Sequence, residues 1–180
     1  MCRDVKTIEN LNTEEKFMDL KYRKAQPDDC RAVYNLMCQL EQTELPFDKF
    51  SEIYSEQTAN ENYYCLLCES FDNEHTGKVI AALNMRFERQ LHHCDCIAEM
   101  TEFAVDAEYR SKGIGKEMFA HACRIAKDFG CPQIELATNQ LRTDAHRFYE
   151  REGMHNFHFK FSKSLLAEDP GSAAENVIGR

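Results

Sequence analysis

The sequence predicts a single domain of mixed α/β class. Apolar residues alternate with polar ones in some segments, as in half-buried strands, and recur every three or four residues in others, as in amphipathic helices. In chain order these segments run strand, two helices, three strands, helix, strand, helix and strand. Residues 20–165 are the expected domain, between a flexible polar extension at 1–19 and a flexible tail at 166–180.

The composition narrows the class of protein. A net charge of −9 argues against nonspecific binding to nucleic acid. No apolar run approaches the roughly 20 residues that span a bilayer, and the first residues lack the apolar core of a signal peptide, so no membrane association is predicted. With nine cysteines and no secretory signal, we expect reduced thiols and a cytoplasmic protein.

The first segments read as one strand and two helices. A strand is expected over residues 20–24, and a helix from Pro27, because proline suits the first helical position. Apolar side chains mark one face of this helix as far as Leu40. A break at Pro46 then precedes a second helix over residues 47–58.

Three strands are expected next, over residues 63–69, 78–89 and 97–105. Residues 72–77 contain Asp, Asn and Gly, which favour a turn, so the first two strands should form a hairpin. The third strand leads directly into a glycine-rich stretch.

The remaining segments are a long helix, a strand, a short helix and a last strand. The long helix should run from Ile114 to Gly130, where glycine suits the C-terminal cap. A buried strand is expected over 133–138, and a short helix over 145–152. Residues 155–163 alternate in polarity, which predicts a last half-buried strand. Its apolar face would carry Phe157, Phe159 and Phe161.

The glycine-rich stretch, residues 109–116, is the strongest indication of a ligand site. It joins a strand to a helix, so the unpaired amides and positive dipole end of that helix point at the loop. Gly113 and Gly115 permit close backbone approach, and Lys112 and Lys116 add positive charge. These features predict a phosphate or pyrophosphate site. Neither the Walker loop nor the dinucleotide fingerprint is present.

The pattern Arg110-x-x-Gly113-x-Gly115 resembles the acetyl-CoA loop of the GNAT superfamily of N-acetyltransferases. Residues 145–154, Ala-His-Arg-Phe-Tyr-Glu-Arg-Glu-Gly-Met, resemble a second signature of that family. The resemblance covers about residues 20–165. It implies a central, mostly antiparallel sheet flanked by helices, with two splayed strands and acetyl-CoA lying in the gap between them. It also implies a small-molecule amine as substrate and leaves a homodimer open.

In the family, the tyrosine of the second signature reaches the cofactor sulfur as general acid, a role that the resemblance gives to Tyr149. Many members carry an asparagine at the position of Arg142, and here Asn139 stands earlier, at the end of the strand. The resemblance assigns cofactor contacts to Phe103, Ala104, Val105, Arg110, Ser111, Lys112, Gly113, Ile114, Gly115, Lys116, Asn139 and His146.

A general base is also needed, because an amine must lose a proton before it attacks a thioester. Glu99 resembles the strand glutamate that some acetyltransferases use for this step. Regular alternation would put Glu99 on one strand face with Thr101 and Phe103, and Glu102 on the other. A salt-bridged carboxylate without a catalytic role is the alternative for Glu99.

Residues 92–96, His-His-Cys-Asp-Cys, combine several metal-ligand types. Adjacent side chains of a strand diverge, and no second ligand pair follows at zinc-finger spacing, so no metal ligands are assigned. A histidine that binds or deprotonates the substrate is favoured instead. The side chains of Cys65 and Cys68 should likewise lie on opposite strand faces.

A closer resemblance is to the aminoalkylphosphonate N-acetyltransferases, through residues 91–93, 97–99, 144–153 and 158–163. It implies an acceptor with a primary amine and a phosphonate, and some members of this branch are associated with a divalent metal. Candidate substrate-binding residues are His92, His93 and Arg142. Alternatives are another amine, such as a polyamine, a metabolite or a protein amine, and a non-catalytic acyl-CoA-binding domain.

Overall fold

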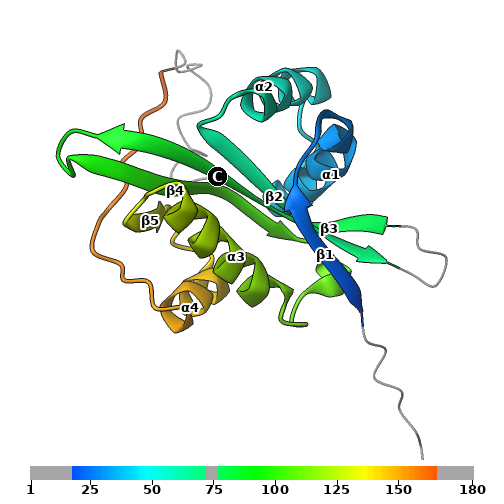
Figure 1. The fold of residues 1–180 in the computed structure, drawn as a ribbon. Helices are drawn as coiled ribbons and strands as arrows, with labels where there is room; N and C mark the ends of the chain where they lie inside the picture. Colours follow the sequence, from blue (N-terminus) through cyan, green and yellow to red (C-terminus); the bar gives the residue numbers. More distant parts are fainter. Residues whose placement is uncertain (1–17, 72–76, 166–180) are drawn as a thin grey trace, which may run out of the picture.

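The computed structural model describes residues 18–71 and 77–165. They form a five-stranded mixed sheet in the order β1-β2-β3-β4-β5 (Figure 1). Neighbouring strands from β1 to β4 are antiparallel, and β5 pairs in parallel with β4. The strands are β1 (Asp19–Lys24), β2 (Tyr63–Phe71), β3 (Gly77–Gln90), β4 (Asp95–Val105) and β5 (Gln133–Leu136).

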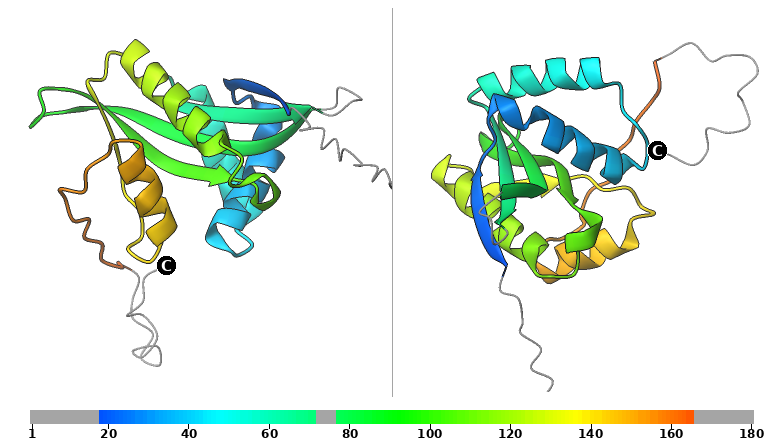
Figure 2. Two further views of the ribbon diagram at one scale, coloured as in Figure 1. Left: turned by 90° about the horizontal axis from the view of Figure 1, so that it is seen from below. Right: turned by 90° about the vertical axis from the view of Figure 1, so that its right-hand side faces the viewer.

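The helices cover both faces of the sheet (Figure 2). Helices α1 and α2 lie on one face, and α3 and α4 lie on the other. The helices are α1 (Cys30–Glu41), α2 (Phe47–Ala59), α3 (Ile114–Asp128) and α4 (Thr143–Arg151), with short 3-10 turns at Pro27–Asp29 and Ala107–Tyr109. The predicted mixed α/β class is confirmed. The two predicted terminal extensions lie outside the described residues, apart from Met18 and Asp19, and Asp19 begins β1. Most of the predicted turn at 72–77 also lies outside them.

Each face of the sheet has its own core. On the α3 face, Leu83 and Met85 of β3 are fully buried against Ile114 and Met118 of α3. On the α1–α2 face, a second cluster includes the buried side chain of Leu67. The side chains of Cys65 and Cys68 fall in different clusters, as strand alternation predicts.

Strands β4 and β5 are hydrogen-bonded over only a short stretch and then diverge. Their pairing runs from Ile97 opposite Gln133 to Met100 opposite Leu136, where β5 ends. Strand β4 continues to Val105, still paired with β3 on its other side. One edge of β4 is therefore not covered by β5 from Thr101 onward, which is the parting of strands that the resemblance implies.

A β-bulge in β4 changes the faces that regular alternation assigns. Asn84 pairs with Glu102 while Met85 pairs with Met100, so Thr101 is the extra residue of the bulge. Glu102 consequently lies on the α1–α2 face, as Glu99 does, and Phe103 packs on the α3 face. The predicted separation of Glu99 from Glu102, and the grouping of Glu99 with Phe103, are therefore wrong.

The predicted last strand is also wrong. Among the described residues after α4, none belongs to a strand, and the segment lies apart from the sheet (Figure 2). Phe157, Phe159 and Phe161 are 78%, 80% and 92% exposed. An alternating pattern gives a strand an apolar face, but a strand also needs a neighbour for its backbone hydrogen bonds, and here the sheet ends at β5.

Candidate active site

The glycine-rich loop has the backbone shape of an anion site. Gly113 caps α3 with a φ of 85°, in the left-handed region that favours glycine, and Ser111 has a φ of 60°. No side chain caps the start of α3 through a hydrogen bond. The first-turn amides of Ile114, Gly115 and Lys116 therefore lack intrahelical partners and suit a phosphate group.

Contacts at Gly115 join three separate parts of the chain. A Cβ at Gly115 would lie 3.7 Å from the ring of Phe148 in α4 and 3.8 Å from the ring of Phe103 in β4. Arg110 Nε donates a hydrogen bond of 3.0 Å to the carbonyl of Val105, which ties the loop to the end of β4. The two signature segments thus meet beside the uncovered edge of β4.

Tyr149 lies on α4 and packs its ring against Phe119 of α3 and the neighbouring Phe148, with centroid separations of 6.3 and 5.2 Å. Burial raises the pKa of the Tyr149 phenol to about 12, and the positive charge of Arg142 opposes this shift to a smaller extent. The phenol is therefore neutral and able to donate a proton at neutral pH.

Asn139 and His146 support the turn between β5 and α4. The side-chain oxygen of Asn139 accepts a 2.9 Å hydrogen bond from the Leu141 amide, and its carbonyl lies 2.9 Å from His146 Nε2. These contacts make both residues structural supports at the entrance to α4, whichever further contacts they make.

The two glutamates of β4 share the α1–α2 face but have different partners. Glu99 accepts a 2.6 Å hydrogen bond from Arg86 Nη2 of β3, which forms an ion pair. Glu102 accepts hydrogen bonds of 3.0 Å from Asn84 Nδ2 and 2.6 Å from the Thr101 hydroxyl. Asn84 Nδ2 also donates to Gln57 of α2 at 2.8 Å. One carboxylate is thus held by a cation, and the other by neutral donors.

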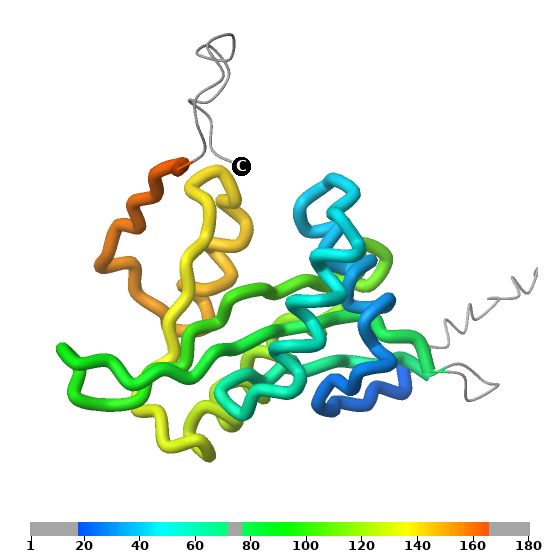
Figure 3. The backbone as a smooth tube through the Cα atoms, turned by 90° about the horizontal axis from the view of Figure 1, so that it is seen from above, coloured from blue at the N-terminus to red at the C-terminus, as the bar shows by residue number. Residues whose placement is uncertain are grey.

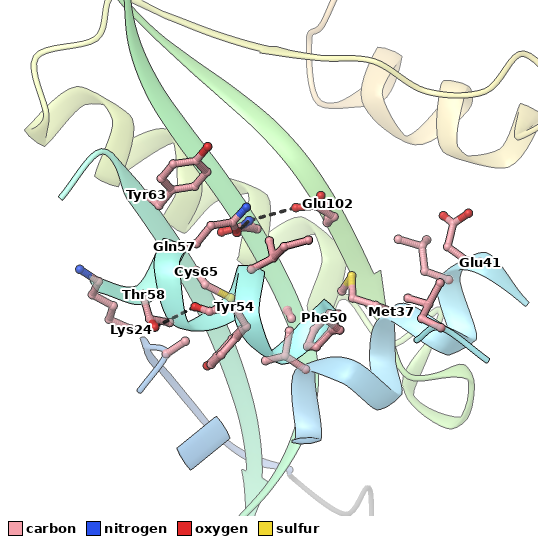
Figure 4. A pocket seen from close by; sticks show the side chains of 17 residues that line it. Lys24, Met37, Glu41, Phe50, Tyr54, Gln57, Thr58, Tyr63, Cys65 and Glu102 are labelled. Atoms are coloured by element: carbon pink, nitrogen blue, oxygen red, sulfur yellow. Dashed lines mark hydrogen bonds between the residues drawn. The ribbon is translucent and has the colours of Figure 1, made fainter. Parts of the chain in front are cut away.

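A cavity of about 310 Å³ opens on this face between the sheet and helices α1 and α2 (Figure 4). Its wall is mostly apolar, with Met37, Phe50 and Tyr54 among the lining residues. The carboxylates of Glu41 and Glu102 line it as well. Such a mixture of apolar wall and few polar groups is typical of small-molecule sites.

The candidate substrate-binding cations have acidic neighbours in two different parts of the structure. Arg142 Nη2 lies 3.2 Å from both the Leu40 carbonyl and Glu41 Oε1 at the end of α1. This contact bridges the two arms of chain that stand apart in Figure 3, α1–α2 and the segment after β5. The His93 ring contacts His92, with centroids 4.2 Å apart, and its Nε2 lies 3.7 Å from Glu135 of β5.

Sequence reasoning missed the polar partners in this region. Arg86, Gln57, Asn84 and Glu41 have no role among the predictions made from sequence. The only available signal was the hairpin, which predicts cross-strand neighbours for Glu99 but not the bulge that shifts the register. Within residues 18–71 and 77–165, no group of three His, Cys, Asp or Glu side chains is arranged to hold a metal ion. The helices in these ranges include none long and apolar enough to cross a membrane.

This architecture is that of solved N-acetyltransferases. An aminoglycoside N-acetyltransferase in complex with CoA superposes with a TM-score of 0.72 at 15% identity, over 84% of this chain and 99% of that one. The chain belongs to the acetyltransferase (GNAT) family, whose sequence model matches residues 30–154. The predicted family is confirmed.

Two curated relatives place the chain within the family. It is 34% identical to the aminoalkylphosphonate N-acetyltransferase of Salmonella typhimurium, over 79% of this chain and 90% of the relative. It is 27% identical to the glucosamine 6-phosphate N-acetyltransferase of Arabidopsis thaliana, over 67% of this chain and 76% of the relative. The chain is therefore an N-acetyltransferase that acts on amines, in a family whose members use acetyl-CoA.

The titration of Tyr149 tests its burial. Its raised pKa of about 12 lies above the value of about 10 in unfolded chains, so the folded protein binds this proton more tightly. The resulting stability is present below pH ~10 and is lost as the pH rises through about 12. We expect the difference in tyrosinate absorbance between wild type and Tyr149→Phe to have its midpoint near pH 12. A midpoint near 10 in the folded protein would place the phenol in solvent instead.

Proposed function

We propose that this enzyme transfers the acetyl group of acetyl-CoA to the primary amine of an aminoalkylphosphonate by direct attack. The observation that carries the proposal is the meeting of the uncapped α3 N-terminus, the uncovered β4 edge and the α4 aromatic pair around Gly115. A nucleotide-linked thioester suits this place, since its phosphates match the helix end and its acyl arm can follow the strand edge.

In this proposal the loop residues 110–116 hold the pyrophosphate through the first-turn amides of α3. Gly113 supplies the left-handed turn, and Lys112 and Lys116 supply positive charge. Phe103, Ala104 and Val105 present backbone groups along the uncovered edge of β4. Asn139 and His146 are proposed as cofactor contacts at the turn that precedes α4.

Glu99 is proposed as the general base, acting directly or through water. At neutral pH an aliphatic amine is mostly protonated, since its pKa is about 10 by analogy with lysine. The Glu99 side chain is 27% exposed, so water reaches it, and Arg86 fixes its position. Glu102 faces the cavity and is held by neutral donors, which makes it the second candidate for the base.

Tyr149 is proposed to stabilise the leaving thiolate. A phenol with a pKa of about 12 is a weaker acid than a thiol of about 8.5, so full proton transfer to sulfur is uphill. A hydrogen bond from the phenol to sulfur nevertheless strengthens as negative charge develops there. The phenol therefore lowers the barrier to C–S cleavage as a hydrogen-bond donor, and the released thiolate takes up a proton from solvent.

The names of the two curated relatives support the acceptor class. Aminoalkylphosphonates and glucosamine 6-phosphate both combine a primary amine with a phosphorus oxyanion. Holding such an anion requires positively charged or hydrogen-bonding side chains. Arg142, which contacts the end of α1, is one proposed ligand, and His92 with His93, in a different part of the structure, are the alternative. Arginine binds phosphonate oxygens in pairs, which would also fix the amine near the thioester.

A cationic amine such as a polyamine is the alternative acceptor. The observation that favours it is the pair of carboxylates, Glu41 and Glu102, in the wall of the cavity. Glu41 is paired with Arg142, and the wall also includes Lys24. The donors to Glu102 among the described residues are all neutral, however, so Glu102 can hold an ammonium group on an aliphatic chain. The two acceptors therefore differ in the charge that the site must hold.

The loop assignment predicts a selective effect of Gly113→Val. A β-branched residue strains the φ of 85°, and its side chain would enter the space in front of the loop, where no protein atom lies within 4 Å of a Cβ. We expect the KM for acetyl-CoA to rise at least tenfold while the KM for the amine changes less. Gly130→Val is the matched control, with a φ of 81° and equally open surroundings at the far end of α3. Equal effects of both variants on the KM for acetyl-CoA would remove the loop from the cofactor site.

The role of Tyr149 predicts a loss of turnover in Tyr149→Phe. This change keeps the ring between Phe119 and Phe148 but removes the hydrogen-bond donor. We expect kcat to fall by about 10²–10³-fold, the usual contribution of one donor aimed at developing negative charge. The thermal midpoint at neutral pH should stay close to that of wild type. Wild-type turnover would return Tyr149 to a purely structural role.

The acceptor class is tested by comparing kcat/KM for aminomethylphosphonate, methylamine and spermidine. Methylamine is the first compound without its phosphonate, so the pair isolates recognition of the anion. We expect a preference of about 100-fold for aminomethylphosphonate, because one charge-assisted hydrogen bond contributes about 1.5–3 kcal/mol. A preference for spermidine would establish the cationic alternative. Transfer to none of the three would overturn both acceptor assignments.

A further inference from the structure

Two thiols lie close together where the pairing of β4 with β5 begins. Cys96 Sγ and Cys131 Sγ lie 2.9 Å apart, although the residues are 35 positions apart in the chain. Cys96 lies next to Ile97, and Cys131 lies two residues before Gln133, the pair of residues where β4 and β5 begin to pair. No step of acetyl transfer uses either thiol.

The two thiols differ in exposure. Cys131 is 4% exposed and belongs to the core cluster on the α3 face, whereas Cys96 is half-buried and packs against the edge of that cluster. A small reagent in solvent therefore reaches Cys96 before Cys131. Burial raises the pKa of the Cys131 thiol to about 12, which keeps it protonated until a partner sulfur is in place.

We propose that Cys96 and Cys131 form a reversible disulfide when the folded enzyme meets a small-molecule disulfide. A disulfide bond is about 2.05 Å long, so the sulfur atoms must approach by only about 0.9 Å. A movement of this size is within the range of rotation about the side-chain bonds of two cysteines.

The chemistry balances in two exchange steps. The Cys96 thiolate attacks the small disulfide RSSR, which forms a Cys96–S–S–R bond and releases RS⁻. Cys131 then attacks the sulfur of Cys96 as its proton leaves, which forms the Cys96–Cys131 bond and releases the second RS⁻. The protons from both thiols convert the two thiolates to RSH. Two cysteine thiols are oxidised, and one RSSR is reduced to two RSH.

The disulfide would close a covalent ring that contains the glycine-rich loop and the helix that follows it. Between Cys96 and Cys131 the chain contains most of β4, the 110–116 loop and all of α3. Oxidation would thus join the two ends of the segment that forms one side of the cofactor gap. A bond of this kind stabilises the folded state mainly by restricting the unfolded chain.

The test is incubation of the folded enzyme with oxidised glutathione, followed by digestion without reduction and mass analysis. We expect one linked pair of peptides, containing Cys96 and Cys131 and lighter by two hydrogens than the separate peptides. The thermal midpoint should rise by roughly 5–10 °C after oxidation, as expected for a loop of this length in a chain of this size. Addition of a reductant should reverse both changes.

Variants separate this pair from the other thiols. Cys131→Ser and Cys96→Ser should each abolish the linked peptides and the thermal shift, and Cys96 is the milder site because it is half-buried. Cys123→Ser is the matched control, since Cys123 is a half-buried thiol on α3 outside the pair, and it should retain both responses. A stable glutathione adduct on Cys96 without the cross-link would overturn the proposal. So would cross-links distributed over other cysteines.

Discussion

The rest of this structure depends on where the hydrogen bonding between β4 and β5 stops. Pairing ends at Met100 and Leu136, although β4 continues to Val105. Backbone N–H and C=O groups on the uncovered edge need partners from solvent, from side chains or from a ligand. Because the chain leaves the sheet after β5, the 110–116 loop and α4 can approach this edge, and Arg110 already takes one carbonyl there. The gap between the strands is therefore our proposed place for the thioester, which would lie there against backbone groups.

The bulge at Thr101 determines which side chains of β4 lie on each face of the sheet. It turns Glu99 and Glu102 to the α1–α2 face and leaves Phe103 on the opposite face with Phe148. The acidic groups that can accept a proton are thus separated by the strand from the aromatic packing around the loop. A single extra residue produces this arrangement, since without it one carboxylate would point into the α3 core.

Most of the fold could be predicted from periodicity, and the order of elements through α4 agrees with the structure. The turn between β4 and α3 could be predicted because two glycines follow a strand and precede a helix. Which residues take the left-handed conformation, Ser111 and Gly113, could not be predicted. The bulge was not readable, because one extra residue leaves the local composition unchanged while it reverses the faces downstream. The prediction of a last strand around Phe159 is wrong for another reason. Alternating polarity describes the two faces of a strand but carries no information about whether a neighbouring strand is present. Ion pairs such as Arg86 with Glu99 depend on register and were also beyond the sequence pattern.

The contact between Arg142 and the end of α1 has a mechanical consequence for the two arms that it joins. Both side chains of the Arg142–Glu41 pair are about two-fifths exposed, and ion pairs of that kind contribute at most about 1 kcal/mol. An ion pair of this strength gives little resistance to separation of the two segments that it joins. Dissolved salt screens exposed charges, so the stabilisation that this ion pair gives to the contact between the two segments should decrease as the ionic strength rises.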